Sequence, residues 1–163
     1  MEKDNITHYC YLDSPLGKLM LAGSEHFLKL IEFSDQKKTK EPDKSWIYSE
    51  SRFKCENDQL IRYFKGELKN FSIKCYITGT AFQNKVLNEL KKIPYGQTMS
   101  YSDVADRIGH PKAYRAVGSA NGKNRLPIIF PCHRVISNNG ELGGFSGGLS
   151  IKRKLLELEL KHA

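Results

Sequence analysis

The sequence has no long apolar run, and this absence excludes several classes of protein. No stretch of the 163 residues approaches the length that a membrane-spanning helix needs. The first residues are polar and charged, without the apolar centre of a secretory signal, and no internal repeat or low-complexity tract occurs. We therefore expect an intracellular protein without membrane contact, cytoplasmic in a prokaryote and nuclear in a eukaryote.

Cysteine is sparse and is not arranged for metal binding. The four cysteines include no Cys-x-x-Cys pair, and the five histidines do not complete a pattern of metal ligands. An even number of cysteines would allow disulfides, but the chain is not a small cysteine-rich secreted domain. We expect reduced thiols, no bound metal and no cofactor.

Acidic residues are few in the second half of the chain. Residues 1–77 hold 13 Lys+Arg and 12 Asp+Glu, whereas residues 78–163 hold 13 Lys+Arg and 6 Asp+Glu. Nearly all of the net charge of +8 therefore lies in the second half. This distribution fits a polyanionic partner such as DNA or RNA, and equally a basic surface that only keeps the protein soluble.

The first half predicts a small α+β domain over residues 1–77. Short runs at 9–12, 18–22 and 27–33 are typical strands, and Asp13-Ser14-Pro15-Leu16-Gly17 is typical of a turn. Together they predict an antiparallel meander. A polar loop is expected at 34–45 and a helix at 51–65, with the boundary between halves near 73–80.

The second half, residues 78–163, predicts a mostly helical domain. Thr80 and Gln83 form a capping box ahead of a helix that ends at Pro94-Tyr95-Gly96. Further helices are expected at 103–108, capped by Ser100 or Ser102, at 112–120 and at 149–161. A glycine-containing turn joins the helices at 103–108 and 112–120. Such a pair is typical of a helix-turn-helix, although many such helix pairs bind nothing.

The expected helix at 112–120 is unusual for one that reads base edges. It carries Ala116 and Gly118 among other small residues, with Arg115 beside them. A major-groove recognition helix normally presents several long polar side chains. Small residues would let the backbone approach a narrow minor groove while one arginine enters the base stack. The same residues would also suit packing against another helix.

The most specific chemistry lies in Pro131-Cys132-His133-Arg134-Val135. This segment follows an apolar run at 127–130, which we interpret as a short buried strand. A nearby base and positive charge can turn a thiol into a thiolate nucleophile. Neighbouring side chains of an extended segment point to opposite faces, so a water would have to join Cys132 to His133 unless the chain turns sharply. The alternative is an inert, buried cysteine.

Taken together, these features favour chemistry on a base that has been swung out of the DNA duplex. Groups on the pairing edge of a base are unreachable while the base is stacked, so the base must leave the duplex before a protein can act on it. This interpretation accounts for the basic half, the small-residue helix and the activated thiol. The glycine-rich segment 143–148 would then form a flexible wall of the pocket.

The chain resembles the 6-O-alkylguanine-DNA alkyltransferases. The resemblance rests on the segments 115–124 and 131–135, is strong over about 80–160, and extends to Ser14-Pro15-Leu16-Gly17-Lys18-Leu19 in the first half. It implies a ribonuclease H-like first domain and a winged-helix-like second domain. It also implies a monomer that binds double-stranded DNA from the minor groove, flips out an alkylated guanine and moves the alkyl group once, irreversibly, to its own cysteine.

The resemblance also implies roles for individual residues. The catalytic set is the acceptor Cys132, the base His133, Glu159 that orients the histidine, Asn124 that braces the cysteine segment, and Tyr101 beside the guanine. The DNA contacts are the arginine finger Arg115 together with Tyr101, Ser102, Ala116, Gly118, Arg134 and Asn138. The pocket is formed by Val135, Phe145, Ser146, Gly147 and Lys152. Without the resemblance, Glu159, Tyr101 and Lys152 would be assigned to a solvated helix face, the core and the surface.

Three departures from the family pattern are present. Arg125 follows the asparagine where proline is usual, which either loosens the loop or adds a phosphate contact. Phe145 replaces a common tyrosine and lacks its hydroxyl. The positions that match zinc ligands of some relatives hold Asn5, Ser24 and Lys29, so we expect no zinc.

Three other functions compete with alkyl transfer. A cysteine hydrolase using Cys132, His133 and Glu159 would turn over without DNA, but adjacent Cys and His argue against it. A binder of DNA lesions without catalysis would lack the acceptor cysteine, which is present here. A helix-turn-helix regulator would leave both the Cys-His segment and the small-residue helix unexplained.

Overall fold

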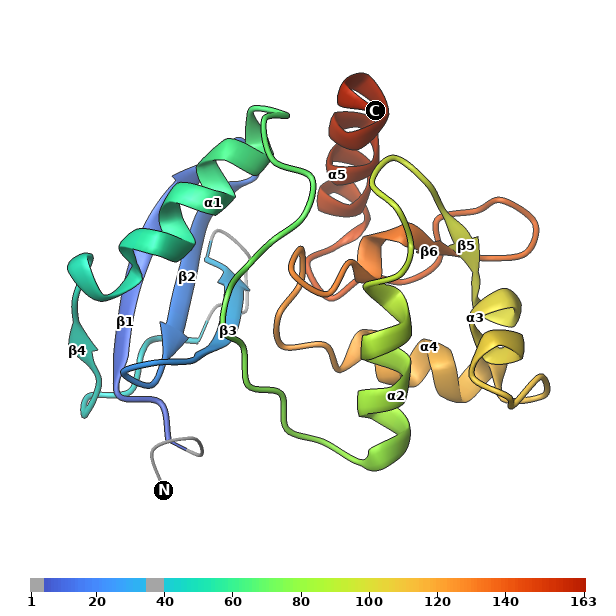
Figure 1. Cartoon of the computed structure of the whole chain (residues 1–163), viewed down its shortest axis with the longest axis horizontal. Coiled ribbons are helices and arrows are strands. Elements are labelled where there is room, and N and C mark those ends of the chain that lie inside the picture. Colours follow the sequence, from blue (N-terminus) through green and yellow to red (C-terminus); the bar gives the residue numbers. More distant parts are fainter. Residues whose placement is uncertain (1–4, 35–39) are drawn as a thin grey trace. The chain divides into compact units, whose positions relative to one another are not determined.

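The computed structural model describes residues 5–34 and 40–163, and the chain forms two compact units, Met1–Ile77 and Thr78–Ala163 (Figure 1). The first unit holds the larger β-sheet and one long helix, and the second holds four helices. The α+β composition expected from the sequence is therefore confirmed.

The first unit is built on the predicted meander. Strands β1 (His8–Ser14), β2 (Gly17–Gly23) and β3 (Leu28–Phe33) are antiparallel neighbours. A fourth strand, β4 (Ile47–Tyr48), pairs in parallel with β1 and completes the order β3-β2-β1-β4. Two residues are too few for an alternating pattern, so the sequence did not predict β4. Of the expected loop at 34–45, residues 40–45 have neither helix nor strand, and 35–39 lie outside the described residues.

One helical segment covers a face of this sheet, as Figure 1 shows. A short 3-10 turn, η1 (Ser51–Phe53), leads into α1 (Lys54–Phe64). The helical spacing of Phe53 and Leu60 in the sequence is what predicts a helix at 51–65, and both side chains are fully buried. Asn57 on α1 also contacts the buried thiol of Cys10 on β1.

The four helices of the second unit confirm the predicted set. They are α2 (Ala81–Leu90), α3 (Tyr101–Arg107), α4 (Tyr114–Gly122) and α5 (Leu149–His162). The capping box at Thr80 is present, and Ser100 rather than Ser102 caps α3. Helices α3 and α4 form the expected helix pair. On α5 the helical spacing of the sequence predicts that Leu155, Leu156 and Leu158 are buried, but only Leu155 is fully buried, and Leu156 and Leu158 remain partly exposed.

A two-stranded parallel sheet connects the start of α3 to the cysteine segment. Strand β5 (Met99–Ser100) pairs with β6 (Val135–Ile136), with Met99 opposite Val135. In this parallel register Tyr101, the next residue after β5, follows on opposite Ser137, the next residue after β6. The sequence did not predict either strand, because each contains only two residues.

The buried strand predicted at 127–130 is wrong. These residues form a tight turn, in which Phe130 N donates to Leu126 O at 3.0 Å and Ile128 has a φ of 76°. A positive φ on a β-branched residue costs of order 1–3 kcal/mol and persists only when neighbours impose it. The apolar run therefore predicted burial correctly and conformation incorrectly, because four buried residues do not distinguish a strand from a turn.

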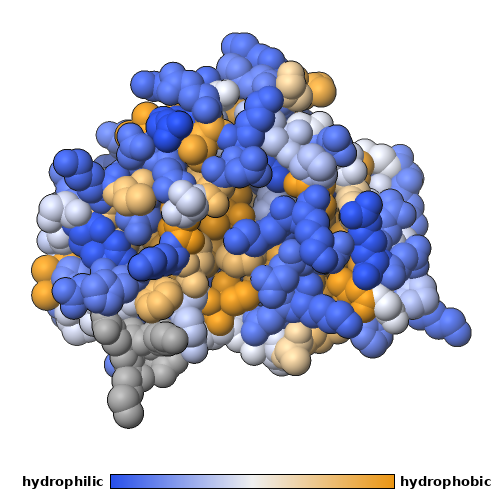
Figure 2. All heavy atoms as spheres, viewed as in Figure 1, coloured by the Kyte–Doolittle hydropathy of each residue, from blue (hydrophilic) through white to orange (hydrophobic). Residues whose placement is uncertain are grey.

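Hydrophilic side chains cover much of the face in Figure 2, with smaller apolar areas between them. No helix in the part of the chain that the structure describes has both the length and the apolar character needed to span a membrane.

Candidate active site

Cys132 lies at the start of a single turn of 3-10 helix, η2 (Cys132–Arg134), directly after the turn at 127–130. The chain thus turns sharply here rather than running extended. Asn124 donates to Phe130 O at 2.8 Å and accepts from Leu126 N at 3.0 Å, so its side chain closes the preceding turn. Asn121 on α4 donates to Cys132 O at 3.3 Å. Two buried amides therefore fix the backbone on both sides of the thiol.

The thiol of Cys132 is almost completely buried, and burial raises its pKa to about 11. The neighbouring Asn124 and Lys152 act in the opposite direction without reversing this effect. The thiolate expected from the sequence is therefore not the resting form at neutral pH. Cys132 is a protonated thiol in the folded protein.

His133 is fully buried and is oriented by Glu159. Its Nε2 lies 2.7 Å from Glu159 Oε1, across 26 positions of sequence. Burial lowers the pKa of His133, although Glu159 acts to raise it, so the ring is neutral at neutral pH. A carboxylate can only accept, hence Nε2 carries the hydrogen and Nδ1 presents a lone pair. Nδ1 is buried and has no hydrogen-bond partner among the described residues.

Glu159 is an ionised carboxylate at the centre of a polar cluster. Burial alone would raise its pKa, but hydrogen bonds from His133 and Arg134 outweigh burial and bring it to about 2. Arg134 Nε donates to Glu159 Oε2 at 2.9 Å and its Nη2 donates to Oε1 at 2.8 Å. The backbone N–H of Gly96 donates to Oε2 at 3.2 Å.

Arg134 does not lie where the sequence analysis placed it. It was expected to contact DNA, yet it is 5% exposed, and its remaining Nη1 donates to Ile93 O at 2.7 Å. Because the buried Glu159 needs a compensating charge, the guanidinium turns inward toward that carboxylate.

Lys152 is a fully buried ammonium group beside the thiol. Its Nζ donates to Val135 O at 2.6 Å and to Gly144 O at 3.2 Å, which ties the glycine-rich segment to β6. Burial lowers its pKa to about 8, while the neighbouring Cys132 acts to raise it. Lys152 Nζ also lies 5.9 Å from the centre of the Tyr101 ring.

Tyr101 forms one side of the same cluster. Burial, followed by the proximity of Cys132, raises the pKa of its hydroxyl, so it remains a proton donor. Gly143 has a φ of 69°, and a Cβ at this position would come within 2.8 Å of the Tyr101 Oη. A side chain at 143 is therefore excluded both by its backbone conformation and by the ring opposite.

The residues expected to contact DNA, apart from Arg134, lie on α3 and α4, except for Asn138, which follows β6. Arg115 and Ala116 are exposed, whereas Gly118 is partly buried and faces the Tyr101 ring. Asn138 donates to Ser102 Oγ at 3.0 Å on the exposed surface.

The remaining pocket residues differ in burial. Val135 and Gly147 are buried, Phe145 is partly buried and Ser146 is exposed; Arg125, three residues after the end of α4, is exposed as well. The structure therefore brings Cys132, His133, Asn124, Glu159, Lys152 and Tyr101 into one cluster, whereas Ser146 is exposed.

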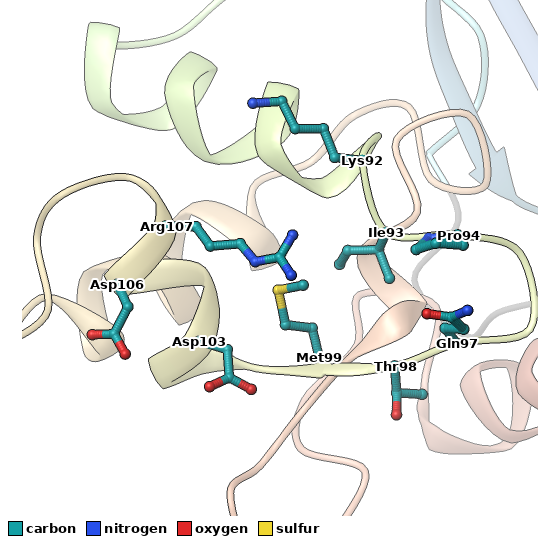
Figure 3. A pocket seen from close by; sticks show the side chains of 9 residues that line it. All are labelled: Lys92, Ile93, Pro94, Gln97, Thr98, Met99, Asp103, Asp106 and Arg107. Atoms are coloured by element: carbon teal, nitrogen blue, oxygen red, sulfur yellow. The ribbon is translucent and has the colours of Figure 1, made fainter.

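A separate cavity of about 530 Å³ does not include the thiol. Figure 3 shows its lining, which is Lys92, Ile93, Pro94, Gln97, Thr98, Met99, Asp103, Asp106 and Arg107. None of these residues was expected in the site. No group of three or more His, Cys, Asp or Glu side chains suited to a metal ion occurs within 5–34 and 40–163.

Sequence reasoning missed two contributors to the site. Asn121 follows Val117 by four positions and so shares its buried helix face, a signal that was available. The backbone N–H of Gly96 donates to Glu159, which lies 63 positions later in the sequence, and no sequence pattern predicts a hydrogen bond of this kind.

Both halves of the chain match a known family. Residues 7–77 match the 6-O-methylguanine DNA methyltransferase ribonuclease-like domain, and residues 81–161 match the DNA binding domain of the same family. The methylated-DNA--protein-cysteine methyltransferase of Methanosarcina acetivorans is 49% identical over 152 residues, which are 93% of this chain and 97% of that protein. Its counterpart from Mycobacterium tuberculosis is 47% identical over 157 residues, 96% of this chain and 94% of that one.

Solved structures agree with these matches. The crystal structure of Mycobacterium tuberculosis OGT in complex with DNA superimposes with a TM-score of 0.89 at 47% identity, covering 96% of this chain and 95% of that one. The O6-methylguanine-DNA methyltransferase from Pyrococcus kodakaraensis shares the fold at 24% identity, with a TM-score of 0.72.

Proposed function

Because the chain belongs to the 6-O-methylguanine DNA methyltransferase family, whose members repair DNA by alkyl transfer to cysteine, we propose that Cys132 is the acceptor here. The alkyl group comes from the 6-oxygen of guanine. The product is a thioether, which has no carbonyl for water to attack. Each molecule therefore acts once.

The observation that carries this proposal is the free lone pair of His133 Nδ1. Glu159 holds the hydrogen of the histidine ring on Nε2, so Nδ1 is a base whose lone pair accepts no hydrogen bond within the described residues. We infer that a water joins it to the thiol. The proton of Cys132 passes to that water, and the water passes a proton to Nδ1.

The transfer itself forms one bond and breaks one bond. The sulfur attacks the alkyl carbon, and the electron pair of the carbon–oxygen bond moves to the guanine oxygen. The departing guanine then takes a proton, and the Tyr101 hydroxyl is a donor placed to assist it. Lys152 adds positive charge beside the sulfur as its proton leaves.

Burial of the thiol requires the guanine to leave the duplex. The exposed Arg115 and Ala116, with Gly118 beside them on α4, support entry through the minor groove with Arg115 in the vacated space. The residues of the cluster all belong to one chain, so the proposed chemistry needs no second copy of the protein.

Intact-protein mass spectrometry tests the proposal. With excess DNA carrying O6-methylguanine, we expect one CH2 unit to be added per protein molecule, located by peptide mapping at Cys132. Cys132→Ala should gain no mass and still bind DNA. Release of guanine beyond one equivalent would instead indicate a hydrolase, and an unmodified Cys132 with unrepaired DNA would contradict the proposal.

A second experiment tests the DNA-binding mode. Affinity should fall with added salt, since phosphate contacts release counterions. Arg115→Ala should slow repair of duplex DNA more than reaction with the free alkylated base, because only the duplex requires flipping. Lys161→Ala, at an exposed position on the last turn of α5, is the control. Equal slowing of both substrates would exclude the finger role.

A further inference from the structure

Tyr114 is an exposed aromatic residue to which the proposed function gives no role. It is the first residue of α4, and 46% of its surface is exposed. Single exposed aromatic residues are common, so exposure alone implies little. The second observation is a contact with the neighbouring residue: the guanidinium carbon of Arg115 lies 5.9 Å from the centre of the Tyr114 ring.

The helix places Tyr114 on a particular flank of α4. Residues four apart lie on one face, so Tyr114 shares its flank with Gly118. A Cβ at Gly118 would contact the Tyr101 ring at 3.8 Å. Tyr114 therefore lies on the side of α4 that faces Tyr101, one turn before Gly118. Val117, Ala120 and Asn121 supply the buried face instead.

The ring is the partner that the fold provides for Arg115. Within residues 5–34 and 40–163, Arg115 makes no ion pair and no hydrogen bond through its side chain, and it is exposed. This contrasts with Arg134, whose guanidinium is held by Glu159 and Ile93. An arginine without such anchors samples many conformations, and ordering it on binding costs free energy.

We propose that Tyr114 is a positioning residue that holds the Arg115 guanidinium for entry into the duplex. The inference rests on the proposed finger role of Arg115. The face of an aromatic ring attracts a cation, and this attraction narrows the conformations of the side chain before DNA arrives. The ring rather than the hydroxyl makes the contact, so phenylalanine should serve as well as tyrosine.

Single-turnover rates of Tyr114→Ala and Tyr114→Phe test the proposal on two substrates, methylated duplex DNA and the free alkylated base. For Tyr114→Ala we expect duplex repair slowed by about two- to five-fold, the range that an exposed cation–π contact supports, and no change with the free base. Tyr114→Phe should match the unaltered protein. Leu160→Ala, which removes another exposed apolar side chain, is the control and should change neither rate.

The decisive comparison uses Arg115→Ala as background. If Tyr114 acts through Arg115, adding Tyr114→Ala to Arg115→Ala should slow duplex repair no further. Three results would overturn the inference. They are a further slowing of duplex repair when Tyr114→Ala is added to Arg115→Ala, a slower reaction of Tyr114→Ala with the free base, and an unchanged rate of duplex repair in Tyr114→Ala. Failure of the proposed function is distinguishable, because the unaltered protein would then leave Cys132 unmodified. Equal melting temperatures of all variants confirm that folding is unaffected.

Discussion

Arg134 holds the carboxylate of Glu159 in a two-pronged contact, with its Nε 2.9 Å from Oε2 and its Nη2 2.8 Å from Oε1. Both side chains are buried. The same carboxylate accepts from His133, so the guanidinium indirectly determines which nitrogen of the histidine carries the hydrogen. The arginine, which was expected at the DNA surface, is thus part of the buried hydrogen-bond network around Glu159.

Arg134→Met should destabilise the protein by about 3–5 kcal/mol, because it leaves a buried carboxylate without its charge partner. Arg134→Lys keeps the charge but loses the planar fork, so a smaller loss is expected. Urea unfolding measures both. The salt dependence of DNA binding, measured where the variant is still folded, should be unchanged in Arg134→Met; a shallower dependence would show that Arg134 contacts phosphate after all.

Glu159 should make stability depend on pH. Its pKa in the folded protein is about 2, below the ordinary value of 4.5, so its contribution is present above pH 4.5 and is lost as pH falls toward 2. The difference in unfolding free energy between the unaltered protein and Glu159→Gln should be roughly 3 kcal/mol at pH 7 and shrink below pH 4.5. Urea titrations across this range measure it, and a constant difference would contradict the assignment.

The rate of alkyl transfer should report the protonation of His133. Burial lowers the pKa of His133 below 6.5, and only the neutral ring accepts a proton. Single-turnover rates should therefore remain level from pH 7 to 6.5 and fall only below pH 6.5, in a range where Lys152, with a pKa of about 8, stays protonated. Glu159→Gln should slow transfer about 10²-fold, since the hydrogen is no longer held on Nε2. A fall that begins above pH 7 would exclude a neutral, buried base.

Lys152 should hold the glycine-rich segment in place. Lys152→Met removes the hydrogen bonds to Val135 O and Gly144 O, so the backbone amides of 143–148 should exchange with solvent faster. The pKa of Cys132 should also rise further, because the nearby positive charge is lost. Hydrogen exchange and thiol titration measure the two effects. Lys154→Met, at an exposed position on the same helix, is the matched control and should change neither.

Local signals explain which elements were predicted correctly. The capping box at Thr80 and the helical spacing of Phe53 and Leu60 depend on residues a few positions apart, and both were confirmed. The strands of two residues, β5 and β6, were missed because they exist only through their pairing with each other. The turn around Ile128 was predicted as a strand, since its apolar residues indicate burial under either conformation.

The sequence by itself determined the reactive segment, the basic second half and the helices, because each depends on neighbouring residues or on composition. Only the tertiary structure decided the partners of the charged groups. Arg134 reaches Glu159 across 25 positions and Ile93 across 41, and Gly96 reaches Glu159 across 63. A buried carboxylate must accept hydrogen bonds from the segments that the fold places beside it. The order of those segments along the chain does not determine how close they lie in space.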